Sequence, residues 1–172
     1  MSQRKRFHHA HGRWAWTLAV AVIAGTSPGS IVAQNPGFER QRELFQLFTN
    51  CEPLVLAVTV EDAGEEANGL DEEAVSRAAR SRLRSARQYT ESGLNLVSIE
   101  VHIVGYAFAV DVELWKTMFD PVTEQYNRAV TWQYGSTGTH GGNGTYVVSQ
   151  VQGVMDVFLD EYLRVNEPAC LS

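Results

Sequence analysis

Two stretches of alternating apolar and polar residues, joined at Gly105, constrain this chain more than any other feature. Residues 94–104 and 106–116 each alternate with a period of two, the period of a β-strand with one buried face. Gly105 between them predicts the tip of a hairpin. The buried positions are expected to be Val97, Ile99, Val101, Ile103, Phe108, Val110, Val112 and Leu114. The fold therefore has to cover one face of this hairpin while the other stays in water.

Two amphipathic segments can supply that cover. Asp71 predicts an N-cap because two glutamates follow it, where they face the positive end of a helix. This helix is expected to run to about Tyr89. Residues 145–166 keep an apolar period of 3.6 and predict a second, longer helix.

Two further strands complete the set. Residues 54–60 are apolar on both faces, which predicts a strand at the centre of the sheet, and residues 128–134 predict the last strand. The resulting order is β-α-β-β-β-α. We therefore predict an α+β fold, a two-layer sandwich in which a four-stranded, mainly antiparallel sheet carries two helices on one face.

The N-terminus has the layout of a secretory signal peptide over residues 1–33. Basic residues precede the apolar run 14–25, and small residues follow it, so we expect cleavage after Ala33, with residues 24–29 as a second candidate. A retained membrane anchor is the alternative, but an apolar core of about 12 residues is short against the roughly 20 that cross a bilayer. The first cysteine, Cys51, lies too far downstream to take a lipid anchor.

Removal of residues 1–33 leaves 172 − 33 = 139 residues, which suit one domain. Residues 34–50 are expected to form an N-terminal extension. Within it, residues 38–48 place Leu44 and Phe45 at helical spacing and predict a short amphipathic helix. Residues 51–172 are expected to form the single α+β domain.

Cleavage also makes the chain strongly acidic. The segment carries 4 of the 14 basic residues and none of the 20 acidic ones, so 10 − 20 leaves a formal charge of −10. Nucleic acids and anionic lipids bind through lysine and arginine, so we expect no nucleic-acid partner and no stable membrane insertion after cleavage.

Cys51 and Cys170 are the two cysteines of the chain. In an oxidising compartment an even pair predicts a disulfide bond. Two free thiols or a redox-active pair are the alternatives, although the chain has no Cys-x-x-Cys motif to favour redox chemistry.

Residues 135–144 form the segment that most resembles a site. Its glycines, among them Gly138, allow close backbone approach and precede a predicted helix N-terminus, where an anion can bind. His140 could act as a base for a hydroxyl of Ser136, Thr137 or Thr139, although the segment supplies no orienting carboxylate. A flexible connection capped by Asn143 or Thr145 is the alternative.

Two surfaces could receive a partner. Arg77, Arg80, Arg84 and Arg87 follow one side of the first long helix and could dock an acidic partner, or could simply be a solvated face. Trp115 shares the wet face of the hairpin with acidic residues, and this face could bind a partner or be covered by residues 38–48.

No metal or cofactor site is predicted. After cleavage the histidines are His102 and His140 on separate elements, which is thin support for a metal site. His102 is expected on the polar face near Glu100, with Asp111 or Glu113 across the hairpin.

The element order and the export signal together resemble small envelope-assembly proteins of Gram-negative bacteria. These include the lipopolysaccharide-assembly lipoprotein, transporter-auxiliary lipoproteins and the N-terminal domain of the translocation protein TolB. The resemblance covers about residues 51–170 and implies a periplasmic binding or assembly factor with an envelope protein as partner. The alternative function is a small hydrolase or anion-binding enzyme centred on His140 and residues 135–144.

Overall fold

The computed structural model describes residues 36–62 and 70–171. All of them belong to the compact unit Gln34–Ser172. The predicted signal peptide and its cleavage site lie outside the described residues.

Four strands form one open sheet in the order β1-β2-β3-β4. Strand β1 is parallel to β2, whereas the β2–β3 and β3–β4 pairs are antiparallel. The elements in chain order are α1 (Pro36–Leu47), β1 (Val55–Asp62), α2 (Glu72–Ser85), β2 (Leu96–Val104), β3 (Ala107–Asp120), β4 (Gln125–Thr139) and α3 (Gly144–Cys170). The predicted α+β class and the cover of the sheet by helices are confirmed.

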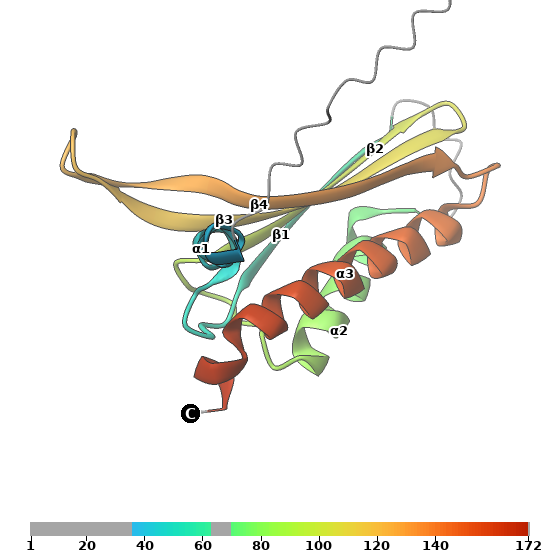
Figure 1. The fold of residues 1–172 in the computed structure, drawn as a ribbon. Helices are drawn as coiled ribbons and strands as arrows, with labels where there is room; N and C mark the ends of the chain where they lie inside the picture. The colour runs from blue at the N-terminus through green and yellow to red at the C-terminus, as the bar shows by residue number, and fades with distance from the viewer. Residues whose placement is uncertain (1–35, 63–69, 172) are drawn as a thin grey trace, which may run out of the picture. The chain divides into compact units, whose positions relative to one another are not determined.

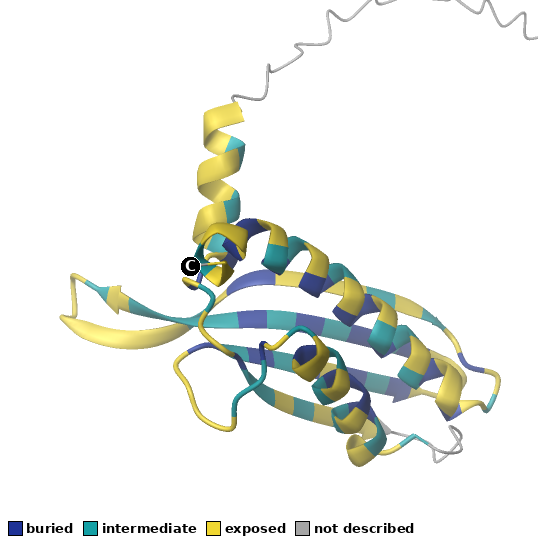
Figure 2. Ribbon diagram, turned by 90° about the horizontal axis from the view of Figure 1, so that it is seen from below, coloured by how far each residue is buried: buried dark blue, intermediate teal, exposed yellow. Residues whose placement is uncertain are grey.

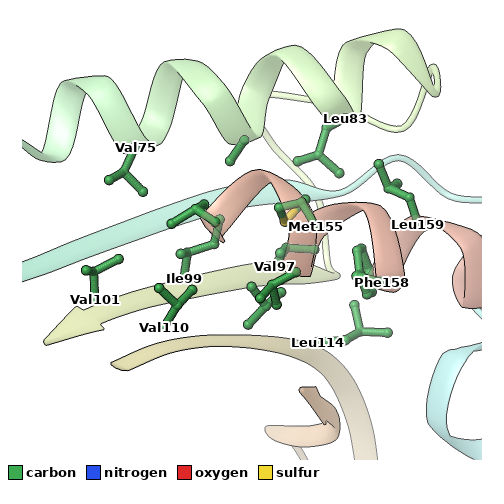
Figure 3. Packing of buried hydrophobic residues seen from close by; sticks show 14 of the residues in the cluster. Val75, Leu83, Val97, Ile99, Val101, Val110, Leu114, Met155, Phe158 and Leu159 are labelled. Carbon is green, nitrogen blue, oxygen red and sulfur yellow. The ribbon is translucent and has the colours of Figure 1, made fainter. Parts of the chain in front are cut away.

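Helices α2 and α3 lie on the same side of the sheet (Figure 1). The alternation around Gly105 decides which side, because the positions predicted to be buried on β2 and β3 are all buried beneath the helices. Figure 3 shows the contact: Val75 and Leu83 of α2 and Met155 and Phe158 of α3 meet the apolar side chains of the strands. We call this covered side the inner face and the opposite side the outer face.

Strand β1 lies at an edge of the sheet, so the predicted central position is wrong. Its apolar residues Leu56, Val58 and Val60 pack against the core, while Ala57 and Thr59 point to the outer face and are exposed. The short side chain of Ala57 made the strand look apolar on both faces. The segment is in fact buried on one face only.

Helix α2 begins as predicted but ends early. The side chain of Asp71 accepts a hydrogen bond from Ala74 N at 2.6 Å, which confirms the N-cap. The helix stops at Ser85, and Arg87 has a left-handed backbone conformation with φ +59°. The chain turns there because Tyr89 forms a bridge with Leu54 and Leu54 N donates to the Gln88 carbonyl.

Helix α1 is present as predicted, but its buried residue is Leu47, while Phe45 stays 55% exposed. It lies on the inner-face side of the sheet. Lys116, on the inner face, donates to the carbonyl oxygens of Phe45 and Phe48 at the C-terminal end of α1. Burial lowers the pKa of this ammonium group. Of the two alternatives for the outer face, the one in which residues 38–48 cover it is therefore wrong.

The end of α3 is tied to the chain before β1. Cys51 and Cys170 form the predicted disulfide, with a Cα–Cα distance of 5.2 Å. The buried Asn166 side chain accepts from Thr49 N at 2.9 Å and donates to the Leu47 carbonyl at 3.0 Å. The disulfide and these hydrogen bonds thus hold the end of α3 against the segment that follows α1.

Candidate functional site

The glycine-rich segment is mostly strand, so the predicted loop over residues 135–144 is wrong. Strand β4 continues to Thr139, with Gly135 paired to Asp111 and Gly138 paired to Phe108. Only residues 140–143 connect it to α3, whose N-cap is Asn143.

Two glycines of this segment make room for neighbours in the sheet. A Cβ atom on Gly138 would lie 2.9 Å from the Phe108 ring, and one on Gly135 would lie 2.5 Å from Asp111 Oδ1. Real Cβ atoms do not come so close to other atoms. The glycines are therefore required by close packing of side chains on β3, and their presence here does not indicate a ligand.

His140 is buried, with 4% of its surface exposed. Its Nδ1 atom accepts from Gly142 N at 3.0 Å, so the ring proton is on Nε2, which donates to the Gly105 carbonyl at 2.9 Å. Both ring nitrogens are thus used by the backbone. The imidazole fastens the β4–α3 connection to the tip of the β2–β3 hairpin.

The hydroxyls considered as nucleophiles point in different directions. Ser136 pairs with Val110 and lies on the inner face, where its hydroxyl is buried without a hydrogen-bond partner among the described residues. Thr137 and Thr139 pair with Ala109 and Ala107 and lie on the outer face. The structure does not assemble these groups into a nucleophile–base pair with His140.

Among the described residues, no helix covers the outer face of the sheet (Figure 1). The cross-strand register places four carboxylates on it: Glu61, Glu100, Asp111 and Glu113. We call these four residues the acidic sheet face. The strand segments 55–62, 96–104 and 107–115 that carry it contain no lysine or arginine.

His102 lies within this face and contacts carboxylates on two strands. Its Nδ1 atom is 3.0 Å from Glu61 Oε2, and its Nε2 atom is 3.6 Å from Glu100 Oε2. The expected neighbours across the hairpin, Asp111 and Glu113, are not its contacts. Among residues 36–62 and 70–171, no cluster of three or more potential ligands is arranged to hold a metal ion.

Trp115 also lies on the outer face, where its indole nitrogen donates to Glu113 Oε2 at 2.9 Å. The aromatic surface continues beyond it along the β3–β4 hairpin, whose end extends past the helices and is exposed (Figure 2). Phe119 and Tyr126 pair there with ring centroids 5.3 Å apart. The strand predicted from the sequence ended at Lys116, so this pair was not predicted. The alternation of Trp115, Thr117 and Phe119 was the available signal.

The predicted arginine stripe is only partly formed. Arg77 and Arg84 are exposed on α2 and Arg80 is half-buried between them, whereas Arg87 lies beyond the helix end. Arg77 pairs with Glu73 at 3.1 Å. The guanidinium groups of Arg80 and Arg84 lie 5.5 and 4.9 Å from the centre of the Tyr89 ring. We call Arg77, Arg80 and Arg84 the arginine face.

Trp132 is a core residue and not part of any site. It is 6% exposed, its indole ring centre lies 5.1 Å from that of Phe158, and its indole nitrogen donates to Glu161 at 2.9 Å.

No helix within the described ranges has the length and apolar character needed to span a membrane.

No model of a known protein family matches the chain, and no curated protein matches it. Among solved structures, it is similar to a dodecamer of a PelC variant from Paraburkholderia phytofirmans, at 16% identity and a TM-score of 0.42, over 63% of this chain and 89% of that one. It is also similar to a "putative lipoprotein" from Caulobacter crescentus, at 8% identity and a TM-score of 0.24, over 77% of this chain and 96% of that one.

Proposed function

We propose that this protein is an exported, non-enzymatic binding or assembly protein of the cell envelope, which receives its partner on the outer face of the sheet. One observation carries the proposal. Helices α1, α2 and α3 all lie on the inner side, so the outer face keeps an aromatic and acidic surface in solvent. Surfaces that combine aromatic side chains with a polar surround are suited to partner binding.

The disulfide supports the location. The Cys51–Cys170 bond forms and persists in an oxidising compartment such as the periplasm. The basic and apolar zones of residues 1–33 agree with that location. The predicted boundaries, an extension over residues 34–50 and a domain over residues 51–172, remain part of this proposal.

The enzyme alternative has less support. A general base needs a free lone pair within reach of the proton that it removes. In His140 the Nδ1 lone pair accepts the Gly142 N–H, and the ring is buried. We therefore place the function on the sheet and not on residues 135–144.

Site-specific cross-linking in the exporting host tests the proposal. A photo-reactive amino acid is placed at Thr59 or Thr137, both exposed on the outer face, and at Ser149 or Asp160, both exposed on α3, as matched controls. We expect a discrete cross-linked product from the outer-face positions and none from the α3 positions. Equal products from both sets, or none from the outer face, would refute the assignment of the binding surface.

A further inference from the structure

We propose that the partner of the acidic sheet face is the arginine face of a second copy of this chain, so that the protein assembles head to tail. This inference rests on the proposed function, because it names the partner that the outer face receives. It goes further by assigning a role to α2.

The acidic sheet face holds charge that the domain itself does not neutralise. Glu100 and Asp111 are direct cross-strand partners in the β2–β3 register. Like charges directly opposite each other destabilise a sheet. Asp111 has no ion pair within the described chain, and its carboxylate lies over Gly135, where a side chain would collide with it. A cation arriving from outside would relieve this repulsion.

The arginine face supplies such cations. Arg80 and Arg84 form no ion pair with any described carboxylate, although the chain carries twice as many acidic as basic residues after residue 33. Both guanidinium groups lie against the Tyr89 ring, which holds them side by side. Guanidinium groups bind carboxylates with well-defined geometry, so they are suited to contacts between proteins.

The two faces point in opposite directions. At about 100° per residue, Arg77 and Arg84 lie roughly opposite the core residues of α2, Val75, Ala79 and Leu83, and the half-buried Arg80 lies on the flank of the helix. The core side of α2 packs on the inner face of the sheet (Figure 3), so Arg77 and Arg84 point away from the sheet. The acidic sheet face points the other way. A contact between them joins different surfaces on the two copies and leaves one of each free, which produces a ring or a filament and not a closed dimer.

The two faces also match in size. Arg77 and Arg84 are separated by seven positions, which is about 10 Å along a helix. Glu61 and Glu113 pair with His102 and Ser98 of β2, which are four positions and about 13 Å apart along the strand. The arginine face and the acidic sheet face therefore have similar lengths along the helix and along the strands.

Charge exchange tests the proposal. The full-length chain is exported, recovered from the periplasm and studied by sedimentation velocity over a range of concentrations. We expect the wild-type protein to form species larger than a dimer. The variants Arg80→Glu/Arg84→Glu and Glu61→Arg/Glu100→Arg should each self-associate about tenfold more weakly or worse, because they place like charges in contact. An equal mixture of the two variants should assemble again, since each then offers the charge that the other lacks.

The controls separate surface effects from net charge and folding. Asp160→Arg/Glu167→Arg changes the net charge as much as the sheet variant does, but at exposed positions of α3, and should assemble like the wild type. Thermal unfolding checks that every variant is folded. A wild-type protein that stays monomeric, or two folded variants that fail to assemble when mixed, would overturn the proposal. If the outer face still cross-links to a different envelope protein, the proposed function stands and only self-assembly falls.

Discussion

The imidazole of His140 donates its Nε2 proton to the carbonyl oxygen of Gly105 at 2.9 Å, across 35 positions of sequence. The backbone around it closes the same junction, because His140 N donates to the Tyr106 carbonyl at 2.9 Å. The tip of the β2–β3 hairpin is thereby fixed to the start of α3. This role accounts for both ring nitrogens without any ligand or substrate.

Substitution of His140 by alanine should therefore destabilise the domain by about 1–3 kcal/mol, because it removes a buried side chain and leaves partly buried backbone groups of Gly105 and Gly142 without partners. Urea unfolding measures the loss. His102→Ala, at a partly exposed position on the outer face, is the control and should change stability by less than about 0.5 kcal/mol. An His140→Ala protein as stable as the wild type would contradict the structural role.

Gly138→Ala should destabilise the domain by about 1–3 kcal/mol, because the added methyl group would lie 2.9 Å from the Phe108 ring. Phe108→Leu should lower the free energy of unfolding less in the Gly138→Ala protein than in the wild type, since a smaller side chain relieves the overlap. Gly153→Ala is the matched control. No atom lies within 4 Å of its Cβ position on α3, so it should stabilise the protein by about 0.5–1 kcal/mol. Additive effects of the two changes at Gly138 and Phe108 would rule out the packing explanation.

Replacement of Cys51 and Cys170 together by serine should lower the free energy of unfolding by about 2–5 kcal/mol. The disulfide joins residues that are 119 positions apart, and the long loop that it closes restricts the unfolded chain. Denaturant unfolding with and without a reducing agent measures this. The reducing agent should lower the stability of the wild type and leave that of the double variant unchanged. The same sensitivity in both proteins would show that the agent acts elsewhere.

Stability should fall at alkaline pH through Tyr162. Burial raises the pKa of its phenol to about 12, and the hydroxyl donates to the Glu52 carbonyl at 3.0 Å. The pKa in the unfolded chain is about 10, so the folded state holds the proton more tightly. The contribution of Tyr162 is therefore complete below about pH 10 and is lost as the pH rises through about 12.

Unfolding free energies measured from pH 9 to pH 12 check this dependence. Tyr162→Phe should flatten the decline, whereas Tyr126→Phe, at a position 74% exposed, should leave it unchanged. An identical decline in the wild type and in Tyr162→Phe would assign the alkaline transition to other groups.

The exported protein should begin after Ala33, because the basic and apolar zones that precede this residue are those of a cleavable signal. Mass spectrometry of intact protein from the periplasm measures the N-terminus. Replacement of Ala33 by a bulky residue, with Ala24 unchanged, should slow cleavage there. A mass that includes Met1 would contradict export through a cleaved signal.

Elements with a local signal could be predicted from the order of the residues alone. The alternation of Val97, Ile99 and Val101 set the buried face of β2, and Asp71 set the start of α2. The two cysteines set the disulfide once export had placed the chain in an oxidising compartment. Each of these depends on the residue itself or on neighbours within a few positions.

Features that depend on residues far away in the chain could not be predicted in this way, because they arise when the chain folds. The end of α2 was decided by Leu54, which draws residues 88 and 89 into an extended bridge. Residues 135–139 became strand because β3 offered them a paired edge, although their glycines favour a loop. The contact of His140 with Gly105 and the cross-strand pairing of Glu100 with Asp111 also depend on residues that only the folded sheet brings together. Backbone pairing and burial across the sheet outweigh local propensity, and neither can be read from one segment alone.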